Sequence, residues 1–430
     1  MIHNFFKSNI HFSYNTDTHI LTSHNSDNFF TPHTAENFKK YKNQDNKRYI
    51  SNRITRLTIF LTDNCNMKCS YCYEREHKKE RENDFNIGLL KRALATLVPK
   101  IDDGIQISFF GGEPLLKYEL IEEIICYLKK NNIKAVYSIT TNGTIYNDNI
   151  VKMIKEHNIH LTISADGIPS IQNSSRKLKN GADSFNVVDN VIEKYISNDL
   201  LLNINVILTH KNRHMLHSYS YFHSKNVNGI LFTPVTTKDT DLLLTNEDVS
   251  EIISETESIY KIILQDMRNG FNKVTLIDKI FMIRNIFPSC KSNFHCGAGI
   301  SSLAIGTNGD IYPCHRFHNI PGWCWGNILD YSNDKVITER NKLIIRKRIP
   351  ICKKCWVVES CQGGCIYENY NCKSDINIPD GLMCSLWKNW YELALWFLYE
   401  CIFLNKDIFE QIYGLNTYEY LKTHVIDRRK

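Results

Sequence analysis

Three cysteines lie close together in the stretch CNMKCSYCY, residues 65–73. Cys65, Cys69 and Cys72 follow the spacing C-x3-C-x2-C, so three thiolate donors share one short segment. A structural zinc site normally needs a fourth protein ligand, and the nearest candidate is His77. A [4Fe–4S] cluster held by three thiolates would instead leave one iron atom without a protein ligand. Zinc and an iron–sulfur cluster with one open position are therefore the two alternatives.

A second and larger set of cysteines lies downstream. Its spacing is C-x5-C, x12-G-x4-C, C-x2-C-x5-C-x3-C and one more cysteine, and its members are Cys290, Cys296, Cys314, Cys352, Cys355, Cys361, Cys365 and Cys384. The C-x2-C pair alone is also compatible with a zinc ribbon. The chain has 15 cysteines, and its first residues lack the basic segment and apolar run of a signal peptide. Because the cytosol keeps thiols reduced, metal ligation is favoured over structural disulfides.

The composition indicates a soluble, cytoplasmic protein with ordinary cores. A length of 430 residues with 43% hydrophobic residues suggests two or three domains. The net charge of +6 is only mildly basic, which argues against a dedicated nucleic-acid binder. The most apolar stretch, residues 390–404, contains two glutamates and predicts a buried amphipathic helix rather than a membrane span. We therefore expect no nucleic-acid partner and no membrane.

Short β-rich runs alternate with helical segments from about residue 54 onward. The runs cover residues 55–62, 105–112, 136–143, 160–167, 201–209 and 229–235. Such alternation implies parallel strands joined by right-handed crossovers, and six units predict an α/β fold, a partial (β/α)6 TIM-like barrel. Chemistry in such barrels lies at the C-terminal ends of the strands. The first cysteine group, GGEP, TNG and SADG follow the first four runs in that order, in agreement with this rule.

The rest of the chain divides around this barrel. Residues 1–50 are polar and predict a small strand-containing appendage without a core of its own. The periodicity fades where the second cysteine set begins, so metals are expected to replace a large core there. The expected division is an N-terminal appendage, the barrel, a helical bridge, a cysteine-rich extension and a C-terminal helical tail, at residues 1–50, 51–245, 246–285, 286–390 and 391–430.

The first cysteine group resembles that of the radical S-adenosylmethionine (SAM) superfamily, including the aromatic Tyr71 just before the last cysteine. The stretch GGEP, with Gly111, Gly112 and Glu113, resembles the second motif of that family. Its glycines would let the backbone approach a ligand, and Glu113 would accept a hydrogen bond from the SAM ammonium. The resemblance implies that the amino and carboxylate groups of SAM chelate the open iron. Reductive cleavage of SAM would then give a 5′-deoxyadenosyl radical that abstracts hydrogen from an unreactive C–H bond.

Further motifs imply contacts to SAM. Ser164 of SADG and Arg176, twelve residues later, resemble the pair that contacts the SAM carboxylate in this family. The family often has His-Asp four and three positions before the arginine, whereas this chain has Gln172 and Asn173, which weakens this part of the resemblance. Asn142 of TNG would reach the SAM ribose or carboxylate, or would simply form an Asn-Gly turn.

The second cysteine set resembles the SPASM extension of radical SAM enzymes, in which eight thiolates hold two auxiliary [4Fe–4S] clusters. The resemblance assigns the first auxiliary cluster to Cys290, Cys296, Cys314 and Cys365, and the second to Cys352, Cys355, Cys361 and Cys384. Of the other cysteines, Cys126 and Cys401 are expected to be buried inert thiols on apolar helix faces. Cys324 and Cys372 lie near these ligands in the sequence and are alternative ligands.

SPASM enzymes typically modify proteins or peptides, and the stretch YPCHRF bears on the reaction. Sulfatase maturases carry an aspartate directly after this cysteine as a proton acceptor, whereas this chain has His315. The stretch looks more like maturases of ribosomally made precursor peptides, which form C–C, ether or thioether cross-links between side chains, including the darobactin and cyclophane type. His315 would accept a proton when a substrate radical is oxidised by an auxiliary cluster, or would merely hydrogen-bond near a cluster sulfur.

The resemblance thus implies a radical SAM oxidoreductase whose cofactors are SAM, the [4Fe–4S] cluster that binds it and two auxiliary [4Fe–4S] clusters. Its partners would be a precursor peptide substrate and an external electron donor of the flavodoxin or ferredoxin kind. No separate recognition domain fits into residues 1–50, so the leader of the precursor would bind this arm by strand addition or bind a separate protein. Two alternatives stay open, a formylglycine-forming sulfatase maturase and a zinc-stabilised scaffold without catalysis.

Overall fold

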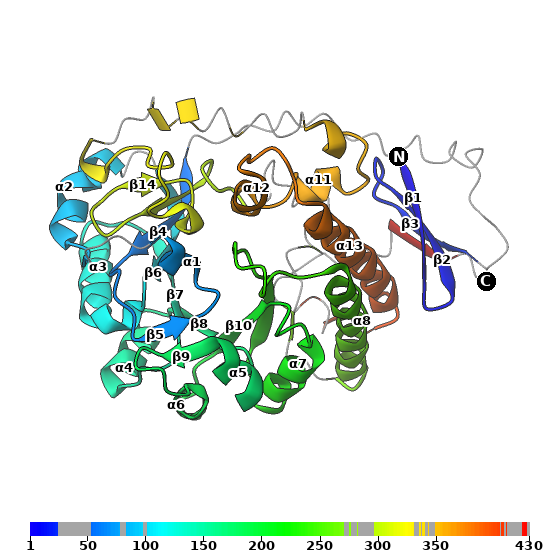
Figure 1. The fold of residues 1–430 in the computed structure, drawn as a ribbon, viewed down its shortest axis with the longest axis horizontal. Helices are drawn as coiled ribbons and strands as arrows, with labels where there is room; N and C mark the ends of the chain where they lie inside the picture. Colours follow the sequence, from blue (N-terminus) through cyan, green and yellow to red (C-terminus); the bar gives the residue numbers. More distant parts are fainter. Residues whose placement is uncertain are drawn as a thin grey trace.

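The computed structural model describes residues 1–24, 53–77, 83–97, 101–270, 275–276, 282, 296–330, 335–336, 338–339, 343, 349–404, 406–407, 410 and 424–427. Strands and helices alternate over the central part of the chain, and the cysteine-rich segments lie along the top of the view in Figure 1. The predicted α/β class is confirmed.

A nine-stranded sheet forms the centre of the molecule, in the order β12-β11-β10-β8-β7-β6-β4-β13-β14. The six predicted strands are present and parallel, as β4 (Ile54–Phe60), β6 (Ile101–Phe110), β7 (Ala135–Thr141), β8 (His160–Ser164), β10 (Leu202–Leu208) and β11 (Gly229–Pro234). Within the described part of the chain β12 and β14 are the two edges, so the sheet does not close into a ring. The expectation of an incomplete barrel is therefore confirmed.

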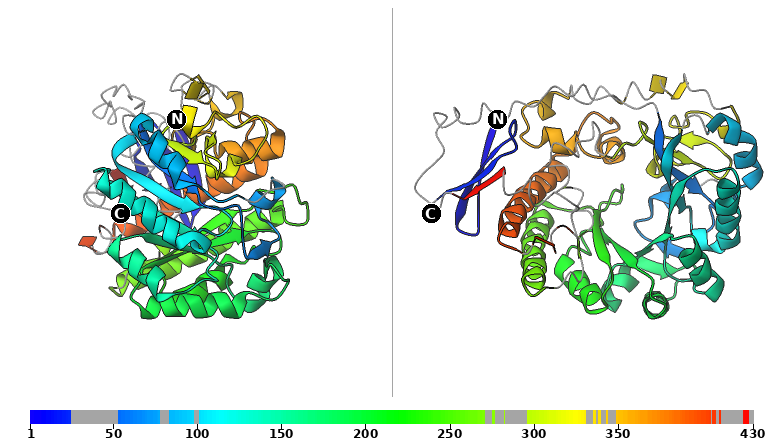
Figure 2. Two further views of the ribbon diagram at one scale, coloured as in Figure 1. Left: turned by 90° about the vertical axis from the view of Figure 1, so that its left-hand side faces the viewer. Right: turned by 180° about the vertical axis from the view of Figure 1, so that it is seen from behind.

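Helices cover the outer face of this sheet, along the left and lower sides of Figure 1 and again in the two views of Figure 2. They are α2 (Ile87–Leu97), α3 (Tyr118–Lys130), α4 (Asp148–Glu156), α5 (Pro169–Ser175), α6 (Phe185–Ser197) and α7 (Met215–Ser224). Helix α4 shows why the local sequence forms such a helix. The Asn147 side chain caps its first turn, while Ile150, Met153 and Ile154 face the sheet at helical spacing.

The two cysteines expected on apolar helix faces differ in burial. Cys401, at the end of the long helix α13 (Gly381–Cys401), is buried as predicted. Cys126 is exposed, so the prediction for that residue is wrong. Helix α3 buries Ile124 and Ile125, and the next residue turns by about 100° away from that face.

The sheet is wider than the six predicted strands because later segments extend it at both ends. Strand β13 (Ser302–Ile305) pairs in parallel with β4, and β14 (Ile311–Tyr312) pairs with β13. Strand β12 (Thr275–Leu276) pairs with β11. The start of the cysteine-rich extension is therefore hydrogen-bonded into the barrel sheet, which holds Cys314 close to the barrel.

Short elements carry the remaining motifs. Those of the barrel loops are β5 (Met67–Cys69), α1 (Tyr73–Glu76), the 3-10 turn η3 (Pro114–Lys117) and β9 (Arg176–Leu178). Those of the cysteine-rich extension are η5 (His315–Phe317), η6 (Ile328–Asp330), η8 (Pro350–Cys352), α11 (Val358–Cys361) and α12 (Ile366–Lys373). Phe317, Ile328, Ile366 and Tyr367 of these elements are buried in the same apolar cluster as the barrel core, and the expectation that metals replace a large core there stays a prediction.

Two long helices, α8 (Asn246–Arg268) and α13, pack side by side against the other end of the sheet (Figure 1). The Trp390 indole donates to Thr256 Oγ1 at 3.0 Å, and the rings of Tyr260 and Phe397 stack with centroids 4.5 Å apart. Helix α13 runs without a break through residue 390, so the expected boundary between the extension and the tail falls inside one helix.

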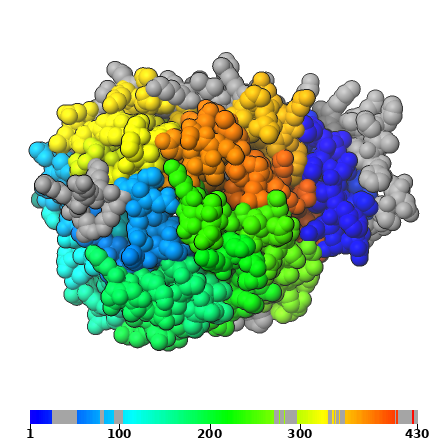
Figure 3. Space-filling model, viewed as in Figure 1, coloured from blue at the N-terminus to red at the C-terminus, as the bar shows by residue number. Residues whose placement is uncertain are grey.

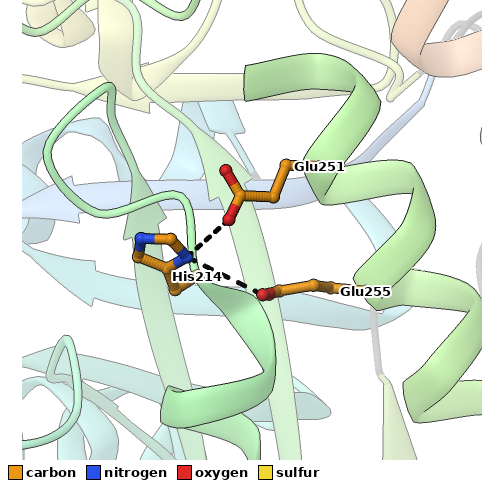
Figure 4. Close-up of side chains that lie close together, drawn as sticks. All are labelled: His214, Glu251 and Glu255. Atoms are coloured by element: carbon orange, nitrogen blue, oxygen red, sulfur yellow. Dashed lines mark ion pairs between the residues drawn. The ribbon is translucent and has the colours of Figure 1, made fainter. Parts of the chain in front are cut away.

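An ion-pair cluster fastens α8 to the barrel wall (Figure 4). His214, at the start of α7, places its Nδ1 2.7 Å from Glu251 Oε1 and 3.8 Å from Glu255 Oε1. Arg213 pairs with Glu251 through its other oxygen at 2.8 Å. Because the two glutamates are one turn apart on α8, both face α7.

A small sheet made from both ends of the chain lies beside α13, where Figure 3 shows the N-terminal residues as a separate blue patch. Its strands are β1 (Ile2–Lys7), β2 (Ile10–Asn15), β3 (Leu21–His24) and β15 (Val425–Asp427). His3 stacks on Trp356 with ring centroids 3.8 Å apart and pairs with Glu392 of α13 at 2.8 Å. The expected strands in the appendage are confirmed for residues 1–24, whereas residues 25–50 lie outside the described residues. Across the described residues, no helix combines the length and apolarity that membrane crossing requires.

Candidate functional site

The first cysteine group lies on the loop that follows β4, at the C-terminal ends of the barrel strands. Cys69 ends β5, which pairs antiparallel with β9 so that Cys69 lies opposite Arg176. Burial, and then the neighbouring Cys69, raises the pKa of Cys72 to about 12. Burial, Glu113 and Cys69 raise the pKa of Cys65. The three thiols are thus close enough to influence one another, as ligands of one cluster must be.

The spacing of the described thiols bears on the zinc alternative. Tetrahedral zinc with bonds of about 2.3 Å would hold its sulfur ligands about 3.8 Å apart. In the part of the chain that the structure describes, no three cysteine sulfurs lie within 4.8 Å of one another, and His77 joins no such group. A [4Fe–4S] cube holds its thiolates further apart, because each binds a different corner. In the described residues the thiols are therefore not gathered as a tetrahedral zinc site would gather them.

The two glycines of GGEP let β6 approach the cysteine loop. Gly111 has φ +141°, and a Cβ there would lie 2.4 Å from the Thr62 carbonyl oxygen. A Cβ on Gly112 would lie 2.1 Å from the Asn64 carbonyl oxygen. The Gly112 amide donates to Thr62 at 2.8 Å. The two glycines thus admit the backbone next to Cys65, and the approach of a ligand to them stays a prediction.

Glu113 is buried and ties the ends of two strands together. Its carboxylate accepts from the Leu115 amide at 3.0 Å, the Thr141 hydroxyl at 2.7 Å and the Asn142 amide at 2.7 Å. The Asn142 side chain in turn donates to Asn66 at 2.7 Å and to Cys65 Sγ at 3.7 Å. Both residues therefore help to fix the cysteine loop through hydrogen bonds. Their contacts to SAM stay predictions.

We expect Glu113→Gln to destabilise the cysteine loop, although the side chain at residue 113 keeps nearly the same volume. A glutamine has one acceptor oxygen for three donors that now share two, so its NH2 group would face the Asn142 or Leu115 N–H. An unsatisfied buried donor costs about 1–3 kcal/mol. Chemical denaturation should show that loss, and SAM cleavage should fall. Unchanged stability together with unchanged cleavage would contradict the assigned role.

Arg176, predicted to clamp the SAM carboxylate, lies buried at the start of β9 with only 4% of its surface exposed. Its Nη1 donates to the Tyr71 hydroxyl at 2.8 Å, and that hydroxyl donates to Asp166 Oδ2 at 2.7 Å. The Arg176 Nε is buried and has no hydrogen-bond partner. Ser164 ends β8 and is partly buried. A buried cationic N–H without an acceptor fits the carboxylate of SAM, whose oxygens would supply one.

The two departures from the family pattern have structural roles. Gln172 accepts from the Asp166 amide at 2.8 Å and donates to Ser184 Oγ at 3.1 Å. Asn173 Oδ1 accepts from the Ser184 amide at 3.1 Å. These residues therefore shape the loop between SADG and Arg176.

Part of the first auxiliary set comes together in the structure. Burial, and then Cys365 and Cys296, raise the pKa of Cys314 above its ordinary value. Burial raises the pKa of Cys365 to about 12. Cys290 lies outside the described residues. Three of the four predicted ligands are therefore neighbours, although they are far apart in the sequence.

The second auxiliary set surrounds one cavity. Its lining includes all four predicted ligands, Cys352, Cys355, Cys361 and Cys384. Burial, and then Cys384 and Cys355, raises the pKa of Cys361 to about 12. A protonated thiol such as Cys361 must release its proton to bind iron. The lining therefore has the chemistry of a cluster site.

His315 begins η5 directly after Cys314, at the junction of the extension and the barrel. Its ring lies 5.1 Å from that of Phe110 and 6.1 Å from that of Tyr73, measured between centroids. Loss of solvent, and then the Arg316 charge, lowers the pKa of His315 to about 3. The imidazole is therefore neutral at pH 7, and its role as a proton acceptor stays a prediction.

A buried His–Glu pair next to the first cysteine group was missed. His318 Nδ1 lies 2.9 Å from Glu74 Oε2, and its ring stacks on Phe60 with centroids 3.9 Å apart. Glu74 follows Cys72 by two residues, whereas His318 comes from the extension. Neither residue has a motif around it, so only the fold reveals the pair.

Comparison with known proteins agrees with this geometry. A model of the radical SAM superfamily matches residues 59–221, and one of the SPASM iron–sulfur cluster-binding domain matches residues 296–356. An uncharacterized protein of Methanocaldococcus jannaschii, MJ0907, is 30% identical over 66% of this chain and 93% of its own length. The chain belongs to the radical SAM superfamily. It is a radical SAM enzyme of the SPASM subfamily, so the alternative of a zinc-stabilised scaffold without catalysis is wrong. Its cofactors are SAM with a [4Fe–4S] cluster, and auxiliary iron–sulfur clusters in the SPASM domain.

Two further relatives bear on the reaction. A cysteine-type anaerobic sulfatase-maturating enzyme of Clostridium perfringens is 26% identical over 77% of this chain and 93% of its own length. The radical SAM cyclopropyl synthase TigE of Paramaledivibacter caminithermalis is 23% identical over 82% of this chain and 76% of its own length.

Two solved structures share the fold of this radical SAM enzyme. The structure of anSMEcpe with bound AdoMet and a Cp18Cys peptide has a TM-score of 0.67 at 23% identity, covering 79% of this chain and 96% of its own. Streptococcus suis SuiB bound to the precursor peptide SuiA has a TM-score of 0.57 at 18% identity, covering 83% and 82%.

Proposed function

We propose that this radical SAM enzyme matures a ribosomally made precursor peptide by cross-linking two of its side chains through a C–C, ether or thioether bond. The observation that carries the proposal is the residue after Cys314, where His315 stands among aromatic rings. A sulfatase maturase of the pattern described above would place an aspartate there as its proton acceptor. A neutral imidazole beside Phe110 and Tyr73 gives this position a different chemistry.

The side chains between the barrel and the SPASM domain support a peptide substrate. Arg316 donates to Thr236 at 3.0 Å, lies 3.7 Å from Glu368 and sits over the rings of Tyr73 and Tyr367. A cation held by aromatic faces and one carboxylate can bind backbone carbonyls or aromatic side chains of a peptide. The junction thus offers recognition beside the predicted radical site.

The proposed roles of the cofactor residues follow from the site geometry. Cys65, Cys69 and Cys72 would hold the cluster that binds SAM, and Arg176 with Ser164 would hold the SAM carboxylate. When bound, the cluster and SAM supply a 5′-deoxyadenosyl radical for hydrogen abstraction. His315 would take up the proton that substrate oxidation releases.

Relatives support both a peptide substrate and a second candidate function. TigE is named as a cyclopropyl synthase, and SuiB was solved with a precursor peptide. The relative from Clostridium perfringens is a sulfatase-maturating enzyme and favours formylglycine formation as the second candidate. Residue 315 argues against that candidate.

One experiment separates the two candidates. The anaerobically reconstituted enzyme is incubated with SAM, a reductant and the short peptide encoded beside its gene, or with a cysteine-containing sulfatase peptide. Cross-linking predicts 5′-deoxyadenosine and loss of about two hydrogen atoms per cross-link from the precursor, with all sulfur retained. Formylglycine formation from cysteine predicts release of sulfide. Sulfide release from the sulfatase peptide and an unchanged precursor would contradict the proposal.

The binding site of the leader and the electron donor are also proposals. In the described part of the chain, β1 has a strand partner on one side only, which leaves a sheet edge where a leader can add as a further strand. The predicted flavodoxin-like or ferredoxin-like donor would deliver the electron that SAM cleavage consumes.

A further inference from the structure

A buried chain of three polar side chains joins SADG to the first cysteine group. Asp166 Oδ2 accepts from the Tyr71 hydroxyl at 2.7 Å, and the same hydroxyl accepts from Arg176 Nη1 at 2.8 Å. All three side chains are at least nine-tenths buried. The carboxylate also accepts from the Ile207 amide at 3.2 Å through its other oxygen. Asp166 is therefore fixed by β10 and fixes Tyr71 in turn.

The hydrogen bonds between Asp166, Tyr71 and Arg176 use only part of the hydrogen-bonding capacity of Arg176. Nη1 is engaged by Tyr71, whereas the buried Nε has no partner. The guanidinium also lies near Cys69: burial raises the pKa of that thiol, and the Arg176 charge opposes this rise. A guanidinium is rigid and planar, so fixing one nitrogen sets the direction of the others.

We propose that Tyr71 and Asp166 are positioning residues for SAM binding: Asp166 orients the Tyr71 hydroxyl, which orients Arg176 so that its remaining N–H groups receive the SAM carboxylate. Neither residue needs to touch SAM for this role. The proposal concerns SAM binding alone and does not depend on which peptide the enzyme modifies.

Charge and position predict opposite results for Asp166→Asn, which makes the proposal testable. If only charge mattered, loss of a buried anion near Arg176 would strengthen binding of a carboxylate. If position matters, binding weakens, because an amide has one oxygen for the two donors, Tyr71 and Ile207, that the carboxylate serves. The two explanations thus predict opposite changes in the affinity of Asp166→Asn for SAM.

The experiment measures SAM affinity on reconstituted full-length protein without peptide, by calorimetry and by the change that SAM causes in the electron paramagnetic resonance spectrum of the reduced cluster. We expect Tyr71→Phe to raise the SAM Kd about tenfold and Asp166→Asn to raise it at least about threefold. Iron content should match wild type in both variants, because neither residue is a predicted ligand.

Tyr221→Phe is the matched control. The Tyr221 hydroxyl also donates to an aspartate, Asp189, which pairs with Lys225, but on the outer helices α6 and α7. Its SAM affinity should equal that of wild type. If Tyr71→Phe fails to take up iron, Asp166→Asn decides the question. SAM binding to Asp166→Asn that equals or exceeds wild-type affinity overturns the proposal, as does Tyr71→Phe with full iron and an unchanged Kd.

Discussion

Cys69→Ala is expected to reduce SAM cleavage to background while most of the fold survives. Cys69 is the central thiol of the first cysteine group, opposite Arg176 in the β5–β9 pair, and alanine offers iron no ligand. The variant should lose about four of about twelve iron atoms and keep the auxiliary clusters. Iron analysis and chromatographic measurement of 5′-deoxyadenosine, both after anaerobic reconstitution, check the two expectations.

The matched control for that variant is Cys126→Ala. Cys126 is also a barrel thiol, but it is exposed on the outer side of α3. It should retain full iron and full cleavage. Full SAM cleavage by Cys69→Ala would contradict the assignment of the first cysteine group.

Cys361→Ala is expected to empty the second auxiliary site and to destabilise the SPASM domain. The thiol lines one pocket with the other three predicted ligands, and α11, the helix that it ends, has no buried residue of its own. Loss of a structural metal site costs several kcal/mol, because the binding energy is folding energy. We expect loss of about four iron atoms and a lower unfolding temperature.

Cys401→Ala is the control for the loss of a buried thiol without loss of a ligand. Cys401 is fully buried at the end of α13. Its removal should lower the free energy of unfolding by about 1 kcal/mol and leave the iron content unchanged. Equal iron in Cys361→Ala and wild type would show that Cys361 binds no cluster.

The barrel strands and the cysteine groups could be predicted because their signals are local. Each β-rich run of the barrel has its own apolar pattern, and C-x3-C-x2-C fixes three donors within one loop. The width of the sheet could not be predicted in this way. Strand β13 has only four residues, and it is a strand because β4 offers it a partner far away in the sequence.

The finer parts of the site depend on contacts that no motif encodes. GGEP was recognisable, but the fact that its glycines pack on Thr62 and Asn64 follows from the crossing of two strand ends. Asp166 lies inside the SADG motif, yet its bond to Tyr71 joins positions 95 residues apart. Cys126 is exposed because it lies one residue beyond the buried face of α3. The apolar composition of the segment does not show which residues lie on that face.

The pairing of β13 with β4 also has a consequence for how the enzyme is made. The Thr55 hydroxyl donates to the Ser301 carbonyl oxygen, across 246 positions of sequence. During translation, the first barrel strand therefore leaves the ribosome long before its neighbour on that side has been synthesised. Until then β4 carries an open hydrogen-bonding edge beside the cysteine loop, on which another strand could pair.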